Sequence, residues 1–496
     1  MNLKKVLCLG NSSEDTDTRS RLLAEQQELS YHGLITEVKE ISPGCYQTSF
    51  YDMSYGDLIE LSKNMDDIII LDQPKNSYLD EHAFHQTISL GKHLKSVCNV
   101  IFLDEEFNET IEDELKTNKS LCILPFIQSV SLNGNYAVCC RSHTPISKVE
   151  STINYSGDAN RNLIKQKMLA GEKLDNYCKI CYDLEDKEII SPRITQTNEW
   201  ANRLDIKHVD DLSKITNPVF YEIRASNQCN LMCRMCNPDW SSLIEKENQK
   251  LKIFNDTKLQ YTGFDHINID KVEKLYVAGG EPTIMLELYT FLEDCIEKKK
   301  TNFEIQLNTN AVSLNKKFKS LLKHFNNFNF EISVDGYGLV NQYIRWPTNW
   351  DKLVTNIDYI YSQGHNISFN SVISIYNIAS LYSTVEFLSD RYKKIPIHLN
   401  PVSFKDNILS PYIFPDAKLI ITNLDKIKKL EIYHNDLVLK SIVDEYLNYF
   451  DTKHVVDLST LAAFFEYNNK LDNARNVKLI DYIPELEQYR TLINRK

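Results

Sequence analysis

The sequence has no long hydrophobic run. Its 496 residues contain no stretch of about eighteen apolar residues, the length that a membrane-spanning helix needs. The short apolar run at residues 6–9 lacks the long hydrophobic region and the cleavage site of a secretion signal. We therefore expect a cytoplasmic protein with no membrane partner.

An excess of positive charge is also missing. The chain has 56 Lys and Arg against 68 Asp and Glu, a net charge of −12. Because nucleic-acid binders usually show a basic footprint, a nucleic-acid partner is not expected. A hydrophobic content of 42% and a charged content of 25% are those of a globular protein.

Several signatures of binding and catalysis are absent as well. No glycine-rich phosphate cradle follows the first expected strand, at residues 4–9, and the loop at 11–17 is acidic. The twelve histidines form no HxxxH pair, and no catalytic triad or cobalamin-type histidine signature stands out. These absences argue against a nucleotide-binding domain, a zinc hydrolase and a B12 protein.

Cysteines, in contrast, are clustered. Eight of the twelve lie within 122–181 and 229–236, which indicates metal ligation in a reducing compartment. Cys229, Cys233 and Cys236 follow an alternating run that predicts a strand. Three thiolates on one loop can hold three corners of an iron–sulfur cube and leave its fourth iron for a small molecule. Zinc or buried free thiols are the alternatives, although structural zinc usually takes four ligands.

The order of motifs after this loop resembles the radical S-adenosylmethionine (radical SAM) superfamily. Gly279, Gly280, Glu281 and Pro282 follow the second expected strand of this region; Asn310, Ser333, Asp335 and Arg345 come at or after the ends of the third and fourth. The resemblance covers residues 217–405 and implies an α/β fold with a partial (β/α)6 barrel. The expected strands are 219–224, 274–278, 304–308, 328–334, 366–373 and 395–402, with helices at 286–298, 316–323, 350–361 and 378–390.

The resemblance also implies a reaction. The three loop cysteines would bind a [4Fe–4S] cluster whose unique iron chelates the methionine amine and carboxylate of SAM. Reductive cleavage of SAM would release a 5′-deoxyadenosyl radical that abstracts hydrogen from a substrate. A flavodoxin or a ferredoxin would supply the electron.

Further residues are expected to contact SAM if the resemblance holds. Residues 279–282 would meet the methionine amine, and Arg345 would pair with the carboxylate, which matches guanidinium geometry. Asn310, Ser333 and Asp335 would hydrogen-bond the ribose and adenine. These three residue types also favour turns and helix caps, which stays the alternative. No catalytic residue is identified.

A second set of cysteines precedes the barrel. Cys122 opens it, a hairpin signal at residues 133–134 leads to Cys139 and Cys140, and Cys178 and Cys181 form a CxxC knuckle. Because side chains alternate along a strand, only one of Cys139 and Cys140 is expected to face a metal. The segment resembles the twitch/SPASM module of radical SAM enzymes, although it lies before the core and lacks the second cysteine set. It implies one auxiliary iron–sulfur cluster, with zinc as the alternative.

Four domains are expected. Residues 1–110 predict a small α/β domain with alternating strands and helices, 118–200 the auxiliary module, 215–405 the barrel, and 406–496 a helical region. In the first domain the expected strands are 4–9, 34–41, 67–71 and 99–103, and the expected helices 18–32 and 81–95. In the last, the expected helices are 416–430, 435–451, 459–467 and 483–493.

The substrate is the least specified part. A peptide or protein side chain is expected, because twitch/SPASM enzymes often modify peptides. The same chemistry on a small molecule, such as a nucleoside or an amino sugar, is one alternative. A non-catalytic scaffold that keeps iron–sulfur or zinc sites is the other.

Overall fold

The computed structural model describes residues 6–9, 67–70, 99–102, 115, 118–132, 135–142, 144–148, 158–186, 190–206, 208–253, 261–402 and 407–493. The contacts divide the chain into two compact units, and each is described by itself. One comprises Met1–Phe126, Leu163–Ile215 and His434–Leu437. The other comprises Ile127–Asn162, Thr216–Tyr433 and Val438–Lys496.

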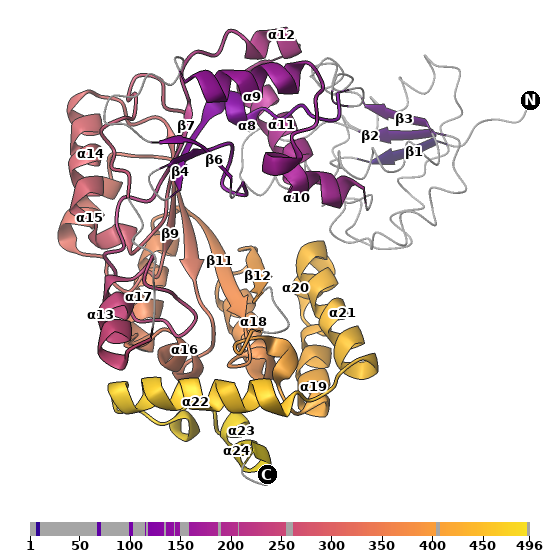
Figure 1. Cartoon of the computed structure of the whole chain (residues 1–496), viewed down its shortest axis with the longest axis vertical. Coiled ribbons are helices and arrows are strands. Elements are labelled where there is room, and N and C mark those ends of the chain that lie inside the picture. The colour runs from indigo at the N-terminus through magenta and orange to yellow at the C-terminus, as the bar shows by residue number, and fades with distance from the viewer. Residues whose placement is uncertain are drawn as a thin grey trace, which may run out of the picture. The chain divides into compact units, whose positions relative to one another are not determined.

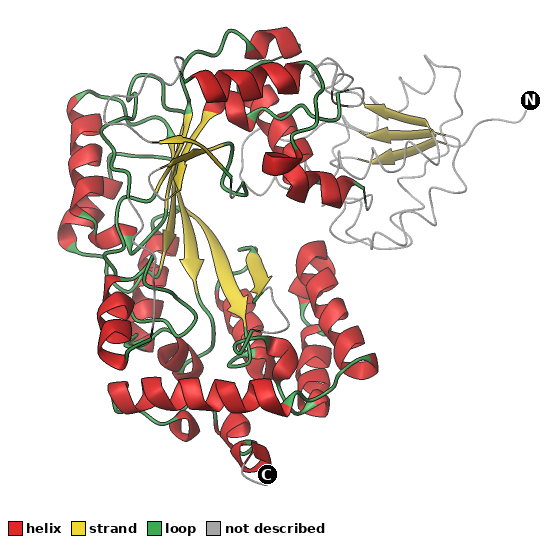
Figure 2. Cartoon of the chain, viewed as in Figure 1, coloured by secondary structure: helices red, strands yellow, loops and turns green. Residues whose placement is uncertain are grey.

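The larger unit is built on one nine-stranded sheet (Figures 1 and 2). The strand order is β12-β11-β10-β9-β8-β7-β4-β5-β6, and β7 to β12 lie in sequence order with every neighbouring pair parallel. These six strands confirm the predicted β/α core, with ends within two residues of the expected ones. Their bounds are β7 Phe220–Ile223, β8 Lys274–Val277, β9 Glu304–Thr309, β10 Phe328–Ser333, β11 Asn366–Ile373 and β12 Ile397–Pro401.

Alternating side chains give this sheet two different faces. In β9, Ile305 and Leu307 are fully buried, whereas Gln306 and Asn308, which alternate with them, are only half-buried. The apolar face packs against the helices that connect the strands, as Phe318 of α15 does with the ring of Phe328 in β10 (6.4 Å between ring centroids). The polar face is left for the site.

The connecting helices begin at side-chain caps that the sequence provides. Ser241, Asn315 and Asn349 each accept a hydrogen bond from a backbone N–H of the first turn, which satisfies one of the donors that a helix start leaves free. The helices are α13 Ser242–Leu251, α14 Leu286–Glu297, α15 Lys316–Leu322, α16 Leu339–Ile344, α17 Trp350–Ser362 and α18 Leu381–Arg391.

The predicted hairpin extends the barrel sheet. Strands β4 Gln128–Leu132 and β5 Asn135–Ala137 pair antiparallel as expected, β6 Pro145–Lys148 joins β5, and β4 pairs parallel with β7. Strand β5 ends at Ala137, so Cys139 and Cys140 lie in a turn beyond it. The strand alternation on which the expected separation of these two cysteines rested therefore stops before reaching them, and that only one of them faces a metal stays a prediction.

The C-terminal region is helical, as expected, but its elements differ in length. Helix α22 runs from Leu458 to Arg475, well past the predicted end at residue 467, while the predicted helix at 483–493 is broken into short pieces. The other elements are α19 Ala417–Ile427, α20 Glu431–Asn435, α21 Leu437–Thr452, α23 Pro484–Glu487 and α24 Arg490–Ile493, with short 3-10 turns at Pro282–Ile284, Ile378–Ser380, Pro411–Ile413 and Leu479–Asp481.

The smaller unit contains a parallel three-stranded sheet of order β1-β2-β3, from Val6–Leu9, Asp67–Ile70 and Asn99–Phe102. Three predicted strands are thus confirmed. The predicted strand at 34–41 and the predicted helices at 18–32 and 81–95 lie outside the described residues. Its helices are α8 Leu124–Ile127, α10 Asp175–Glu185, α11 Pro192–Arg203 and α12 Val209–Leu212, and α9 Ala159–Leu169 spans the division between the units.

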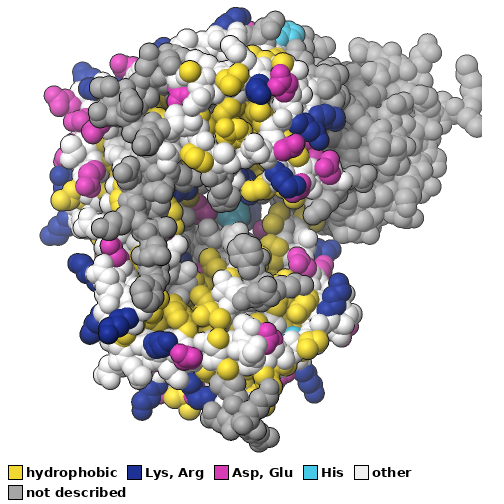
Figure 3. Space-filling model, in the orientation of Figure 1, with side chains coloured by type: hydrophobic (Ala, Val, Ile, Leu, Met, Phe, Trp, Pro, Cys, Tyr) yellow, Lys and Arg dark blue, Asp and Glu magenta, His cyan; other side chains and the backbone are white. Residues whose placement is uncertain are grey.

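Surface polarity is mixed on the face that Figure 3 shows. Lys and Arg side chains are interspersed with Asp and Glu there, without a large area of one sign. Among the described residues, no helix combines the length and the apolar character needed to cross a bilayer.

Candidate active site

The three predicted cluster cysteines border one cavity. Cys229, Cys233 and Cys236 follow β7 on a loop, and the cavity beside them has a volume of about 360 Å³. The structure places every predicted core site residue except Pro282 on its wall. The described lining residues are Cys229, Cys233, Met235, Cys236, Asn237, Trp240, Gly279, Gly280, Glu281, Asn308, Thr309, Asn310, Ser333, Asp335, Arg345, Asn370 and Val372.

Backbone hydrogen bonds hold the cysteine loop in place from one side. The N–H groups of Met232 and Arg234 donate to the carbonyl oxygens of Trp346 (2.7 Å) and Ile344 (2.8 Å). The loop therefore runs along the segment that follows β10, the same segment that carries Arg345. Cys233 lies between the two anchored residues.

The glycine pair after β8 holds the loop from the other side. Gly280 N–H donates to the carbonyl of Ser226 (3.0 Å), and Glu281 N–H donates to that of Gln228 (2.8 Å), just before the first cysteine. A Cβ on Gly280 would lie 2.0 Å from the Gln228 oxygen, and Gly279 has a φ of +114°, which side chains rarely adopt. The two glycines thus let the backbone of the cysteine loop approach the end of β8.

Glu281 is held by neighbouring protein groups. Its Oε1 accepts hydrogen bonds from Thr283 N (3.0 Å), Thr283 Oγ1 (2.6 Å) and Thr309 Oγ1 (2.5 Å), and its Oε2 accepts from Asn310 N (2.7 Å). Burial raises the pKa of this carboxyl group, and the hydrogen bonds oppose that rise. The side chain joins the loop after β8 to the end of β9, where the sequence suggested contact with an ammonium group.

Arg345 and Asp335 form a buried ion pair on the cavity wall. Arg345 Nε donates to Asp335 Oδ2 at 2.6 Å, and Arg345 Nη1 lies 3.9 Å from Cys233 Sγ. Asp335 Oδ1 accepts from Val372 N at 2.8 Å, so both oxygens of its carboxylate are engaged. Asp335 therefore orients the guanidinium toward the cysteine loop, whereas the sequence suggested a ribose contact.

The remaining predicted residues sit at strand ends. Asn310 donates through Nδ2 to Asn230 Oδ1 (2.8 Å), next to Cys229. Ser333 donates to Asn308 Oδ1 (3.3 Å) on the neighbouring strand. Both side chains line the cavity, so both are placed to meet a ligand there.

Sequence reasoning missed several residues of the cavity wall. Asn308 and Asn370 belong to the polar face of the sheet, and Asn370 accepts a hydrogen bond from Asn400 at 2.7 Å. Their position near the carboxyl ends of expected strands was the available signal. Trp240 follows the cysteine loop, and no periodic pattern pointed to it.

The donor set suits an iron–sulfur cluster. Burial and, to a lesser extent, the neighbouring Cys233 raise the pKa of Cys229 and Cys236 to about 12, so these thiols keep their protons until a metal replaces them. Among the described residues, no group of three or more His, Cys, Asp or Glu could hold a metal ion. In a cube of iron and sulfide, each cysteine binds a different iron. The three thiols therefore need not converge on one point, as the ligands of a single metal ion must.

The predicted auxiliary cysteines are divided between the two units. In the smaller unit, Cys178 and Cys181 are half-buried and lie three residues apart on one face of helix α10, in place of the predicted knuckle. Cys122 is buried, and the residues around it are fixed by Ser120 Oγ, 3.2 Å from Tyr182 Oη of α10. In the larger unit, Cys139 is half-buried and Cys140 is exposed.

Comparison with known protein families identifies the domain. Residues 223–388 match the radical SAM superfamily, so this part of the chain is a radical SAM domain. The matched segment begins at the end of β7 and includes the cysteine loop, the glycine pair and Arg345.

Curated relatives share only part of the chain. A GTP 3′,8-cyclase of Campylobacter lari is 30% identical over 187 residues, which are 36% of this chain and 53% of the cyclase. An uncharacterized protein of Methanocaldococcus jannaschii is 26% identical over 224 residues, which are 43% of this chain and 73% of that protein. The chain thus spans about half the length of the cyclase.

Two solved structures are also similar. The structure titled native anSMEcpe with bound AdoMet has 16% identity and a TM-score of 0.31, over 48% of this chain and 62% of that chain. Streptococcus suis SuiB bound to precursor peptide SuiA has 16% identity and a TM-score of 0.29, over 64% of this chain and 67% of that chain.

Proposed function

We propose that the cavity beside Cys229, Cys233 and Cys236 binds a [4Fe–4S] cluster and SAM together. The observation that carries this proposal is the single cavity, which brings three thiols, the glycine pair and the Arg345 guanidinium onto one wall. When bound, such a cluster supplies one electron that cleaves SAM to methionine and a 5′-deoxyadenosyl radical, which abstracts hydrogen from a substrate. A flavodoxin or ferredoxin of the cytoplasm is the proposed source of that electron.

The residues of the chain have distinct parts in this proposal. Arg345, oriented by Asp335, offers its remaining N–H groups to the methionine carboxylate, since a guanidinium binds a carboxylate in a fork. Asn308, Asn310 and Ser333 supply amide and hydroxyl groups at the strand ends for the ribose and adenine. Met235 and Trp240 add apolar surface that restricts water at the thiols.

We further propose a peptide or protein side chain as the substrate. Among the described residues that line the cavity, Arg345 is the one cation, and it already pairs with Asp335. A triphosphate would leave its charges without partners on such a wall. The side-chain amide of Asn370 suits the neutral hydrogen-bonding groups of a peptide.

A cluster at the second cysteine set completes the proposal. In the smaller unit, Ser120 and Tyr182 bring the segment of Cys122 to helix α10, which carries Cys178 and Cys181. We propose that these three thiols contribute ligands to one auxiliary iron–sulfur cluster, and zinc remains the alternative metal.

The decisive test of the core proposal is formation of 5′-deoxyadenosine. Protein reconstituted with iron and sulfide and reduced without oxygen should convert SAM to 5′-deoxyadenosine, measured by chromatography. The triple variant with Cys229, Cys233 and Cys236 changed to Ala should form none. Equal product from the triple variant would refute a cluster at this loop.

The substrate is tested by the same product. Peptides, GTP and an amino sugar are added separately, and release of 5′-deoxyadenosine is compared with a mass change in the additive. A peptide whose mass change matches the deoxyadenosine formed supports the proposed substrate class. Acceleration by GTP or the sugar alone would replace it with a small molecule.

A further inference from the structure

Arg234 lies inside the cysteine loop, and its side chain leaves the loop for the C-terminal helix. Arg234 lies between Cys233 and Cys236 in the sequence, and its side chain is fully buried. Its Nη2 donates to Asp472 Oδ1 at 2.6 Å and its Nη1 to Asn468 Oδ1 at 3.0 Å. Both acceptors belong to α22, more than 230 residues away along the chain.

The same guanidinium also binds the segment before Arg345. Arg234 Nε donates to the carbonyl oxygen of Tyr343 at 2.9 Å, and its Cζ lies 3.5 Å from the centroid of the Tyr343 ring. A buried guanidinium is stabilised only when partners meet its donors, and here three nitrogens have one each. Arg234 thus joins the loop, α16 and α22 at one point.

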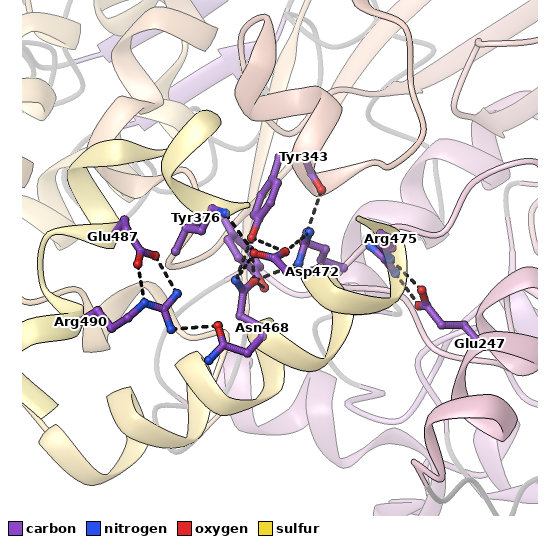
Figure 4. A network of polar contacts seen from close by, with 11 residues as sticks. Glu247, Tyr343, Tyr376, Asn468, Asp472, Arg475, Glu487 and Arg490 are labelled. Atoms are coloured by element: carbon purple, nitrogen blue, oxygen red, sulfur yellow. Dashed lines mark hydrogen bonds and ion pairs between the residues drawn. The ribbon is translucent and has the colours of Figure 1, made fainter. Parts of the chain in front are cut away.

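Asp472 is itself fixed in place. Besides Arg234, it accepts a hydrogen bond from Tyr343 Oη at 2.8 Å and one from the backbone N–H of Leu479 at 3.0 Å. Figure 4 shows Asn468 and Asp472 of α22 directed toward Tyr343 and Tyr376. These bonds fix the position of the Asp472 carboxylate, and the carboxylate in turn fixes the position of the Arg234 guanidinium.

A second buried ion pair fastens the far side of the loop. Arg475, the last residue of α22, donates through Nε and Nη2 to Glu247 Oε1 (2.8 Å) and Oε2 (2.6 Å) in α13 (Figure 4). The two side chains are 1% and 8% exposed. Helix α13 starts six residues after Cys236, so α22 binds both the loop and the helix that leaves it.

We propose that α22 is a positioning element for the cluster, and that Asp472 sets the geometry of the cysteine loop through Arg234. Apolar residues of α22 such as Phe464, which packs on the ring of Tyr376, already hold the helix in place, and two buried charged pairs are added to that packing. Buried ion pairs often add little stability compared with apolar residues, and directionality is what they supply. Asp472 does not line the cavity, so it acts through the groups it binds, Arg234 and the hydroxyl of Tyr343.

The test removes the pair without leaving a buried charge. In the double variant Arg234→Met with Asp472→Leu, no charge is left buried, and the protein should stay folded at the assay temperature, although its melting temperature should fall because the backbone N–H of Leu479 loses its acceptor. Iron retained after anaerobic reconstitution, measured in the variant that also lacks the five auxiliary cysteines, should fall at least about fivefold. The matched control is Glu466→Leu with Lys470→Met, an exposed pair on the same helix (2.9 Å), which should retain wild-type iron.

A measurement on cluster-free protein tests the positioning role of α22 separately from the proposed cluster. In cluster-free protein, the rate at which N-ethylmaleimide labels Cys236, followed by peptide mass spectrometry, should rise at least about fivefold in the double variant and stay unchanged in the control. Wild-type labelling in the double variant would overturn the positioning role, whatever the iron result. Labelling that rises while wild-type protein takes up no iron would contradict the proposed cluster and leave the positioning role supported.

A milder change covers the case in which the double variant fails to fold. Arg234→Lys keeps the charge but loses the forked donors that reach Asn468 and Asp472 together. It should fold and should show faster labelling of Cys236. Wild-type labelling in this variant would likewise overturn the proposal.

Discussion

At the scale of single residues, close approach of two backbones explains the glycine pair. Gly280 faces the carbonyl of Gln228, and no side chain fits between them. The residue thus determines where the cysteine loop lies, in addition to any contact with SAM. The glycine at position 280 is therefore explained by packing within the chain as well as by the expected contact with SAM.

We expect Gly280→Ala to lose cluster binding. Its Cβ would lie 2.0 Å from the Gln228 oxygen, so the loop that enters Cys229 must move. Iron retained at the core cysteines should fall to less than about a third of the wild-type content, since ligand geometry is set by the surrounding residues. Iron analysis after anaerobic reconstitution measures this.

Gly263→Ala is the matched control. Among the described residues, the atom nearest to the added Cβ would be Asp265 Oδ2 at 3.9 Å, an ordinary contact distance. It should retain wild-type iron. If both variants retained it, the loop would not depend on the close approach at residue 280.

Asp335 acts through Arg345. Asp335→Asn removes the charged partner of a buried guanidinium, so the guanidinium loses its fixed orientation. A charge-assisted hydrogen bond contributes about 1.5–3 kcal/mol, so the affinity for SAM should fall roughly tenfold to hundredfold. Equilibrium dialysis with labelled SAM on reconstituted protein measures the change.

The control for Asp335 is the exposed pair of Arg391 and Asp358. It is also a hydrogen-bonded pair of an arginine and an aspartate, with side chains 45% and 40% exposed. Asp358→Asn should leave SAM affinity unchanged, because exposed pairs contribute little. An equal loss in both variants would show that Asp335 has no specific role.

At the scale of elements, the strands were predictable and the contacts of the polar residues were not. Alternation is local, so β9 and β10 could be read from their own residues. The second half of α22 contains polar residues, such as Asn468 and Asp472, that are buried by partners far away in the sequence. No local pattern reveals such a partner, and the predicted helix therefore ended too early. For the same reason, the bonds of Glu281 to Thr309 and Asn310 were not foreseen.

The packing of α15 on the sheet gives a stability prediction. Phe318 is fully buried, and its ring packs against those of Tyr289 and Phe328, with 5.9 and 6.4 Å between the ring centroids. Phe318→Ala should lower the free energy of unfolding by about 3–5 kcal/mol, because it leaves a cavity in the core. Chemical denaturation followed by circular dichroism measures this.

The neighbouring position offers the comparison. Lys317 lies on the exposed side of the same helix, with its side chain 53% exposed. Lys317→Ala should change the free energy of unfolding by less than about 0.5 kcal/mol. A small effect at Phe318 would mean that α15 does not belong to the barrel core.

At the scale of the whole molecule, the hairpin of the expected auxiliary module continues the barrel sheet. Strand β4 pairs with β7, so Cys139 and Cys140 belong to the same unit as the cysteine loop. Cys122, Cys178 and Cys181 belong to the other unit. The sequence indicated both cysteine sets, because their spacing is local. It could not indicate that β4 of the hairpin pairs with β7 of the barrel, because that pairing joins residues far apart in the sequence.

If the second cysteine set binds an auxiliary cluster, the protein should retain iron when the cysteines of the core loop are removed. A variant with Cys229, Cys233 and Cys236 changed to Ala, purified without oxygen, should retain roughly four irons per chain if the second set holds a cube. Adding Cys178→Ala and Cys181→Ala should remove them. Zinc in place of iron would make the second set a structural zinc site.

The central claim, that cluster and SAM share one cavity, is tested most directly by electron paramagnetic resonance of the reduced protein with SAM labelled at its methionine amine and carboxylate. To isolate the core cysteine loop, the auxiliary cysteines are changed to Ala. The account predicts a cluster signal whose g-values shift on adding SAM, with hyperfine coupling to the labelled nitrogen and oxygen. A cluster signal that is identical with and without SAM, and without such coupling, would contradict it.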